Sequence, residues 1–595
     1  MAIEINGINR FGLWLLLVVL TVTLLIFPTY MTYSNAPIQS ISIFQNFPLF
    51  GVLFCIWLGA LLLLLLSKSS RGDGNCEKLV LVCIFSAVFL GFWTISTFSA
   101  GFGEGMNSAA AVNYLNNIGK ITTGISNFAY FDFPGLHIIG SFVSQITGID
   151  PIRTASLIVF CQGIGLSALL YVLFKYLLNN TNFAALAVLI VVQGNIWIAK
   201  LNIFHPRDLG LVLLATFLVL IFRKKDRLFG TVSDTIIMLI VVTSTTTTHF
   251  VTSILFFFIM LGIYFVEKVR RGSSSDVDVS ALAVFIVFPL VWAIYWATGT
   301  FGFTIQTIST SLQTWLQGGN QVWTILMMAN SNFGGSMPLW STITRIFWLA
   351  LIYGFGSIVG LWNLFRIKKL NRMEKKLTGT LLAIIVVSII STIGSTGGER
   401  FDTYILYGAF MTVPILLWFL LKPKNTIGKC SLIGLIILFF ILSFPTFLSN
   451  NNLVEESTYY PEEHAMGNFL ASTSTSKLNI YFTEPETPFL MAYYTPNAYF
   501  YNLNPIPIMK NEADLWAGVQ NLSESFESWA DQPVADVVFP LTERSTTYYL
   551  HFFGVGSDNE GWQSLINTLE TNNIIYDSGN VQIFSVRFVS NNVTQ

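Results

Sequence analysis

The hydrophobic positions of this chain gather in thirteen long apolar segments, separated by shorter polar stretches. Most segments are close to the roughly 20 residues that an α-helix needs to cross a bilayer, although 207–222 is shorter. Apolar runs of this length predict membrane spans, and the polar run from Thr243 to Thr248 divides two of them. We place the spans at 11–31, 46–66, 79–98, 153–176, 181–199, 207–222, 231–247, 249–267, 280–299, 341–365, 377–395, 403–421 and 430–447.

The segment 99–152, between the third and fourth spans, has helical patterns of its own. Met106, Ala110, Tyr114 and Ile118 recur at helical spacing, and Gly119 follows as a helix stop. A surface helix ordered between two spans indicates a functional loop rather than a simple connection.

A second helix is expected after Asp132. Pro134 stands early in it, and Leu136, Val143 and Ile146 share one face. Asp132 precedes Phe-Pro, which fits the N-cap of this helix as well as a functional carboxylate.

The composition agrees with the apolar pattern. The chain is 53% hydrophobic and 11% charged, whereas soluble domains carry about 25% charged residues. We therefore expect a polytopic α-helical membrane protein with about 13 transmembrane helices in residues 1–447.

The basic residues predict the orientation. With thirteen spans, every basic cluster falls on one side, and the positive-inside bias makes that side the cytoplasm. The N-terminus would be cytoplasmic, and the loop 99–152 and the C-terminal region would be extracytoplasmic. The clusters are Lys68/Arg71/Lys78, Arg223/Lys224/Lys225/Arg227, Lys268/Arg270/Arg271, 366–376 and Lys422/Lys424/Lys429.

Residues 448–595 predict a separate acidic domain of α/β type. This region holds 17 Asp and Glu against 4 Lys and Arg, so phosphate repulsion argues against nucleic acid as a partner. It has no cysteine, which excludes a disulfide framework. We expect strands at 477–482, 535–539, 574–576 and 581–586, and helices near 461–471, 513–522 and 561–571.

Several polar residues collect on the predicted extracytoplasmic side. Glu104 lies in the loop 99–152, within Gly-Phe-Gly-Glu-Gly, and a solvated loop residue is its plain alternative. Arg400, within Gly-Gly-Glu-Arg-Phe-Asp before the twelfth span, is costly at an apolar boundary unless it has a partner or binds an anionic head group.

The turn between the fifth and sixth spans reads His205-Pro-Arg-Asp208. Asp208 could cap the following helix, and Arg207 could simply mark the membrane interface. His137, His205 and His249 lack the spacing of metal ligands, so the histidines do not predict a metal site.

The arrangement of these residues indicates more than any one of them. Acidic residues in two loops and an arginine in a third would all lie at the membrane surface, next to the lipid. Transfer of a group from a lipid phosphate needs a carboxylate to deprotonate the acceptor and a cation or metal to stabilise the departing phosphate.

The order of these features resembles GT-C superfamily integral-membrane glycosyltransferases, which use polyprenyl-phosphate sugars. In that family a span is followed by a long loop with an acidic residue and two surface helices, then by two spans and a short acidic turn. Tyr130-Phe-Asp-Phe-Pro-Gly-Leu-His137 resembles the aromatic-Pro-Pro/Gly-His stretch of these loops, and Arg400 resembles the late basic residue that contacts the lipid phosphate.

The resemblance implies roles for individual residues. Glu104 would be the catalytic base or a metal ligand, and Asp208 would be the second acidic residue. Arg400 and Arg207 would hold the phosphate. His205, Asp132 and His137 complete the implied substrate site.

The implied reaction is an inverting displacement at the anomeric carbon. The donor would be a polyprenyl-phosphate sugar, and the acceptor a lipid, a glycan or a protein. No cofactor is firmly implied, although Glu104 and Asp208 could bind Mg²⁺ or Mn²⁺.

Thirteen spans followed by an extracytoplasmic domain also resemble oligosaccharyltransferase catalytic subunits. The tail has no Trp-Trp-Asp-Tyr-Gly motif, which argues against transfer of a whole glycan to asparagine. A transporter or flippase of a lipid-linked or polar substrate is the alternative, and the scarcity of charges within the spans counts against ion coupling.

Overall fold

The computed structural model describes part of the chain. The described residues are 7–33, 48–67, 74–97, 104–121, 132–194, 204–223, 232–268, 279–298, 372–394, 461–473, 479–482, 493–494, 499–502, 536–542, 573–577 and 581–587, with scattered positions at 309, 358, 362 and within 434–443.

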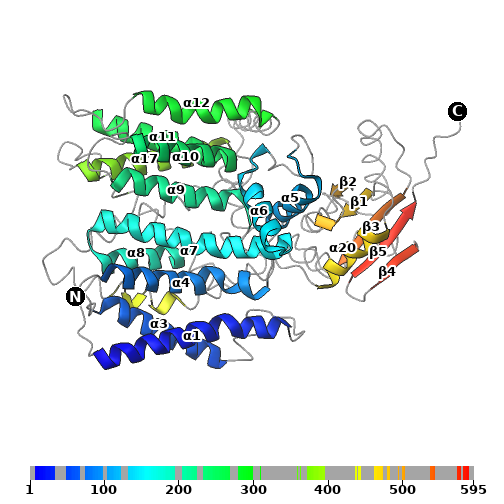
Figure 1. Cartoon of the computed structure of the whole chain (residues 1–595), viewed down its shortest axis with the longest axis horizontal. Helices are drawn as coiled ribbons and strands as arrows, with labels where there is room; N and C mark the ends of the chain where they lie inside the picture. The colour runs from blue at the N-terminus through cyan, green and yellow to red at the C-terminus, as the bar shows by residue number, and fades with distance from the viewer. Residues whose placement is uncertain are drawn as a thin grey trace.

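A bundle of long helices makes up most of the described chain, and its members run side by side (Figure 1). Each coincides with a predicted span. The predicted spans 341–365 and 403–421 lie outside the described residues, apart from positions 358 and 362, and 430–447 is described only at scattered positions. The bundle helices are α1 (Gly7–Tyr33), α3 (Pro48–Leu66), α4 (Gly74–Thr97), α7 (Pro151–Leu178), α8 (Thr181–Gly194), α9 (Pro206–Arg223), α10 (Val232–Thr248), α11 (Phe250–Lys268), α12 (Val279–Tyr295) and α17 (Arg372–Gly394).

The bundle has the character of a membrane domain. Among the described residues, four helices are long and apolar enough to cross a bilayer: 9–26, 49–66, 151–178 and 250–268. Large apolar side chains also face outward from the bundle, including Phe11 (72% exposed) and Val287 (53% exposed). A soluble protein would bury much of this surface, whereas a lipid bilayer accommodates it.

The bundle core is built from close apolar packing. Phe217 of α9 stacks on Phe256 of α11, with ring centroids 4.1 Å apart. Where α11 meets α17 the backbones approach each other directly, because a Cβ at Gly379 would stand 2.7 Å from the carbonyl oxygen of Gly262. Small residues at this crossing allow the close approach that membrane helices use for packing.

Two shorter helices, α5 (Glu104–Ile118) and α6 (Gly135–Thr147), confirm the helices expected in the loop 99–152. Gly119 ends α5 as predicted, with φ +71° and its N–H bonded to the carbonyl of Leu115. Figure 1 shows both helices at one end of the bundle, which we call the α5/α6 end.

The N-cap expectation for Asp132 is wrong. The N-cap position of α6 is Pro134, which makes no side-chain capping bond. The chain enters α6 through a short 3₁₀ step at Asp132, so this carboxylate stands too early in the chain to cap the helix.

The C-terminal region contains a five-stranded mixed sheet in the order β2-β1-β3-β5-β4. Strand β1 is parallel to β2 and β3, whereas β5 is antiparallel to β3 and β4. The expected helices near 513–522 and 561–571 lie outside the described residues. The elements are α20 (Pro461–Thr473), β1 (Asn479–Phe482), β2 (Tyr499–Asn502), β3 (Asp536–Thr542), β4 (Asn573–Asp577) and β5 (Val581–Arg587).

The C-terminal region packs on the α5/α6 end. Met466 and Leu470 of α20 join Met106 and Val112 of α5 in one buried apolar cluster, together with Phe204 before α9. The sheet and α20 therefore rest on the same segments that carry the candidate site.

Candidate functional site

The turn that precedes α9 is rigidly built. Phe204 is fully buried in the cluster shared with the C-terminal region. His205 Nδ1 accepts a hydrogen bond of 3.0 Å from the backbone N–H of Arg207, so His205 caps the helix. Pro206, with its fixed φ, begins the helix. The capping role considered for Asp208 therefore belongs to His205, and this bond leaves the His205 proton on Nε2 in the neutral ring.

Arg207 and Asp208 form a buried ion pair in the first turn of α9. Arg207 Nε lies 3.3 Å from Asp208 Oδ1, and the two side chains are 8% and 2% exposed. Two side chains removed from water stay ionised only when each has a compensating charge, and here each is the partner of the other. The positive end of the α9 helix dipole further stabilises the Asp208 carboxylate. This pair fixes a cation and an anion at the α5/α6 end.

The junction between α10 and α11 faces this turn. His249 separates the two helices, which confirms the division expected at 247/249. Its ring lies 6.4 Å from the ring of His205, edge to face, and its Nδ1 is 2.8 Å from Thr252 Oγ1. A Cβ at Gly210 would stand 2.8 Å from Thr252 Oγ1, so glycine permits this close approach of α9.

The start of α6 packs on the same junction. A Cβ at Gly135 would collide with Thr248 Oγ1. The ring of Phe133 lies 6.1 Å from that of Phe250. The carbonyl of Asp132 accepts a bond of 3.0 Å from Trp292 Nε1 on α12.

The junction from Thr248 to Thr252 therefore connects the two predicted site segments. The segment around Asp132 contacts it through Gly135 and Phe133, and the segment 205–208 contacts it through Gly210 and His205.

His137 lies fully buried on the inner face of α6. Burial disfavours its charged form and lowers the pKa of His137 to about 4. The ring is therefore neutral at pH 7, where it can donate one hydrogen bond and accept another.

Two predicted site residues are not placed by the structure. Glu104 is the first residue of α5, but its side chain is not among those described, and Arg400 lies outside the described residues. Of the predicted set, His205, Arg207 and Asp208 stand together, while Asp132 lies just before the neighbouring helix α6 and His137 lies in its first turn.

The metal expectation remains a prediction. Within the described residues, no three His, Cys, Asp or Glu side chains are grouped closely enough to hold a metal ion. Carboxylate oxygens such as those of Asp208 suit Mg²⁺ or Mn²⁺, and the side chain of the other candidate ligand, Glu104, lies outside the described residues.

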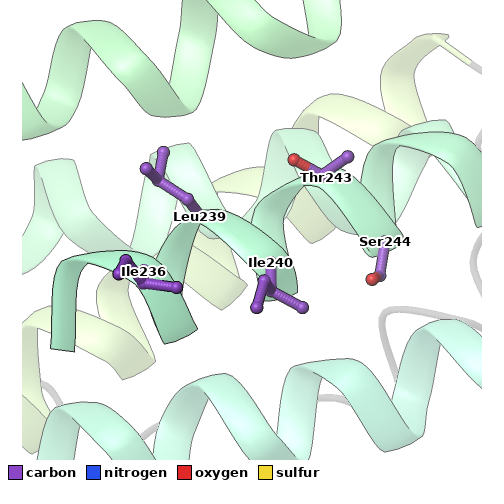
Figure 2. Close-up of a pocket in the computed structure, with 5 residues that line it drawn as sticks. All are labelled: Ile236, Leu239, Ile240, Thr243 and Ser244. Carbon is purple, nitrogen blue, oxygen red and sulfur yellow. The ribbon is translucent and has the colours of Figure 1, made fainter. Parts of the chain in front are cut away.

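An open apolar groove lies along α10 (Figure 2). Its volume is about 300 Å³, and it is lined by Ile236, Leu239, Ile240, Thr243 and Ser244. Figure 2 shows Ile240 and Ser244 directed to the same side of the helix. Ser244 precedes Thr248 by one helical turn, so the groove ends close to the α10/α11 junction.

Sequence reasoning missed the importance of the α10/α11 junction. The sequence pattern marks His249 only as a histidine without metal-ligand spacing, and it gives no sign of Thr252 or Trp292. The one available signal was the polar run that ends in His249 between two apolar segments. Contacts between distant segments, such as Trp292 with Asp132, leave no trace in local periodicity.

No family model matches the chain, and no curated protein matches it by sequence. Its structure is similar to the archaeal oligosaccharyltransferase AglB from Archaeoglobus fulgidus in complex with an inhibitory peptide and a dolichol-phosphate. The TM-score is 0.50 at 12% identity, over 82% of this chain and 72% of AglB.

A second structure of the Archaeoglobus fulgidus oligosaccharyltransferase, in complex with Zn and sulfate, gives TM-score 0.50 at 12% identity, over 81% of this chain and 70% of that one. ArnT from Cupriavidus metallidurans, bound to undecaprenyl phosphate, gives TM-score 0.48 at 11% identity, over 87% and 98%. The chain therefore shares its fold with the oligosaccharyltransferase AglB, in line with the architecture that its order of elements predicts.

Proposed function

We propose that this protein is a membrane glycosyltransferase that moves a sugar from a polyprenyl-phosphate-linked donor to an acceptor on the extracytoplasmic face. The observation that carries the proposal is the buried Arg207–Asp208 pair beside His205 at the α5/α6 end. The fold supports it, since the similar AglB structure holds a dolichol-phosphate.

In the proposed reaction an acceptor oxygen or nitrogen attacks the anomeric carbon from the side opposite the phosphate. The bond from that carbon to the phosphate oxygen breaks, polyprenyl phosphate leaves, and the configuration is inverted. The acceptor proton passes to a carboxylate, for which Glu104 is the proposed base. Asp208 is the second carboxylate, which orients Arg207 and the acceptor.

Arg207 and Arg400 are the proposed phosphate-binding residues. A guanidinium matches phosphate with paired hydrogen bonds and keeps its charge when buried. Asp208 holds the Arg207 side chain in place before the donor arrives, so little reorganisation is needed when charge develops on the leaving phosphate. His205, Asp132 and His137 are proposed to bind the sugar or the acceptor.

Asp208 and Glu104 would hold a divalent cation, Mg²⁺ or Mn²⁺, through carboxylate oxygens. Bound there, the cation would add positive charge beside the leaving phosphate. Arg207 would supply positive charge at the same end of the bundle. Its side chain is 8% exposed, so this charge acts away from bulk water.

The groove on α10 is proposed to hold the first part of the polyprenyl chain. Ile236, Leu239 and Ile240 are between 40% and 58% exposed along it, which suits contact with a hydrocarbon chain. A chain lying there would bring its phosphate to Ser244 and, one helical turn further, to Thr248, which precedes His249.

Two further parts of the proposal concern the whole chain. The N-terminus is proposed to be cytoplasmic, and residues 448–595 to be an extracytoplasmic domain. Because α20 packs on α5 and on Phe204, this domain would cover the site from the side opposite the bundle.

The experiment that tests the proposal uses the full chain in proteoliposomes. A panel of polyprenyl-phosphate monosaccharides labelled in the sugar is added with lipid, glycan and peptide acceptors. Transfer of label to an acceptor, with release of polyprenyl phosphate, is expected for one donor. Movement of an intact donor between leaflets without any release would instead establish a flippase.

A further inference from the structure

The first half of α5 contains two buried polar side chains that lack hydrogen-bond partners. Asn107 is 9% exposed and Ser108 is 1% exposed. Among the residues that the structure describes, neither Asn107 Oδ1 nor Ser108 Oγ has a hydrogen-bond partner. Nearly all buried polar groups in folded proteins are paired, because an unpaired one costs free energy. Two adjacent unpaired groups therefore need a physical reason.

Asn107 differs in this respect from two other asparagines of the same helix. Asn113 Nδ2 donates to the carbonyl of Tyr493 at 3.1 Å, which holds α5 against the C-terminal region. Asn116 Oδ1 accepts a bond of 2.6 Å from Ser141 Oγ, which holds α5 against α6. These two asparagines fix the helix in place, whereas the Asn107 carbonyl oxygen has no such role within the described part of the chain.

Ser108 differs in the same way from other buried serines. Inside a helix, a serine hydroxyl can bond to the carbonyl oxygen four residues earlier. Ser86 of α4 donates in this way to the carbonyl of Val82 at 2.9 Å, and Ser167 of α7 to that of Gly163 at 3.0 Å. The Ser108 hydroxyl makes no such bond to any described residue, so it can still donate and accept.

Both residues lie close to Glu104 on the helix. Glu104 begins α5, three residues before Asn107 and four before Ser108, and residues at these spacings are neighbours on a helix surface. Because side chains lean toward the N-terminus of their helix, Asn107 and Ser108 are directed toward the first turn of α5. The same helix also reaches the segment before α9, where Met106 and Phe204 share one apolar cluster.

The chemistry of the two groups fits a neutral, hydroxylated ligand. The Ser108 hydroxyl donates and accepts, and the Asn107 amide oxygen accepts, so together they match the hydroxyl groups of a sugar ring. An ionised phosphate only accepts hydrogen bonds and cannot satisfy the Asn107 oxygen. A Mg²⁺ ion is usually held through one or two carboxylates, and neither residue is one.

We propose that Asn107 and Ser108 bind hydroxyl groups of the sugar on the lipid-linked donor, and so select which sugar the protein accepts. The inference rests on the proposed function, because it assigns the partner of these groups to the donor. The sugar supplies the missing hydrogen bonds when the donor binds. A site that bonds a substrate hydroxyl rejects analogues without it, since its own buried polar groups then stay unpaired.

The first measurement compares melting temperatures of the full chain without ligand. Ser108→Ala removes an unpaired hydroxyl and introduces a better helix former, so its melting temperature should equal or exceed that of the wild type. Ser141→Ala is the matched control, since Ser141 is 6% exposed but bonded to Asn116, and its melting temperature should fall. An equal fall in both variants would show that Ser108 is paired in the free protein and would overturn the proposal.

The second measurement is the rise in melting temperature when a donor binds, which requires no transfer. Polyprenyl-phosphate glucose, mannose, galactose and arabinose are each compared with polyprenyl phosphate alone. At least one sugar should add to the rise in the wild type and in Ser141→Ala. In Ser108→Ala, and in Asn107→Leu, which roughly keeps the side-chain size, the dissociation constant of that donor should increase about 2- to 10-fold, which corresponds to one hydrogen bond.

The outcomes separate this inference from the proposed function. Equal sugar-dependent rises in the wild type, Ser108→Ala and Asn107→Leu would overturn the sugar site, and so would the lack of any sugar-dependent rise. A rise with Mg²⁺ alone that both variants abolish would overturn it in favour of a metal. A sugar-dependent rise that both variants weaken, without transfer in proteoliposomes, would support the sugar site and refute the transferase.

Discussion

The replacement Asp208→Asn separates a structural role of the buried ion pair from a functional one. The amide keeps the size of the side chain but removes the charge beside Arg207. Glu77→Gln is a matched control, because Glu77 pairs with Arg10 at the opposite end of α4 from α5. The side chains of that pair are 15% and 7% exposed, so both pairs are largely withdrawn from water.

The expected loss of stability follows from burial. Removing one partner of a buried ion pair costs about 3–5 kcal/mol, because the remaining charge stays in a poorly solvated place. Asp208 is 2% exposed, so its variant should lie in this range, and the more exposed Glu77 variant at its lower end.

The activities should differ far more than the stabilities. Asp208 is proposed to hold Arg207 where charge develops on the leaving phosphate, and loss of one such preorganised electrostatic contact lowers the rate about 10²- to 10³-fold, or roughly 2.7–4 kcal/mol of transition-state stabilisation. Apparent melting temperature and sugar transfer are measured for both variants in one detergent. If Asp208→Asn and Glu77→Gln lose activity only in proportion to stability, Asp208 has no role beyond packing.

Three further predictions concern the surroundings of the site. Burial lowers the pKa of His137 from its usual 6.5 to about 4, so the unfolded chain takes up a proton there before the folded protein does, and the free energy of unfolding falls by up to about 3 kcal/mol between pH 6.5 and pH 4. His137→Gln should flatten the melting-temperature profile over that pH range, and an unchanged slope would contradict this. Gly140→Ala places a Cβ 2.7 Å from Val112 Cγ2 and should cost about 1–3 kcal/mol; the double variant with Val112→Ala should recover most of the loss in a melting assay, and purely additive losses would count against the contact. Gly379→Ala should destabilise the protein because a Cβ there meets the backbone of α11, whereas Gly59→Ala, with open space around it, should not, and equal melting temperatures for the two would refute the close approach.

The long-range arrangement was harder to predict than the helices. Continuous apolar runs locate the bundle helices because each run must satisfy its own backbone bonds in lipid. The stop at Gly119 was also predictable, since glycine readily adopts the left-handed conformation. Strand β2 was missed because Tyr499 to Asn502 is short and has no alternating pattern of its own.

The candidate site was predicted by residue type but not by geometry. The turn at 205–208 was recognised, yet the cap is His205 rather than Asp208, because the imidazole nitrogen reaches the N–H of Arg207. The spacing predicts that Leu136, Val143 and Ile146 share one face of α6. In the structure Leu136 is fully buried and Ile146 is 68% exposed, because the buried face of the helix also carries polar residues that contact α5.

The central claim is that the protein transfers a sugar from a lipid phosphate, and that the charged turn at the start of α9 takes part. The most direct measurement is the amount of polyprenyl phosphate that the reconstituted protein releases from a polyprenyl-phosphate sugar, followed by mass spectrometry. Release that requires an acceptor and that falls at least about 100-fold in Asp208→Asn is the predicted result. Equal release by the wild type and by Asp208→Asn would contradict the account.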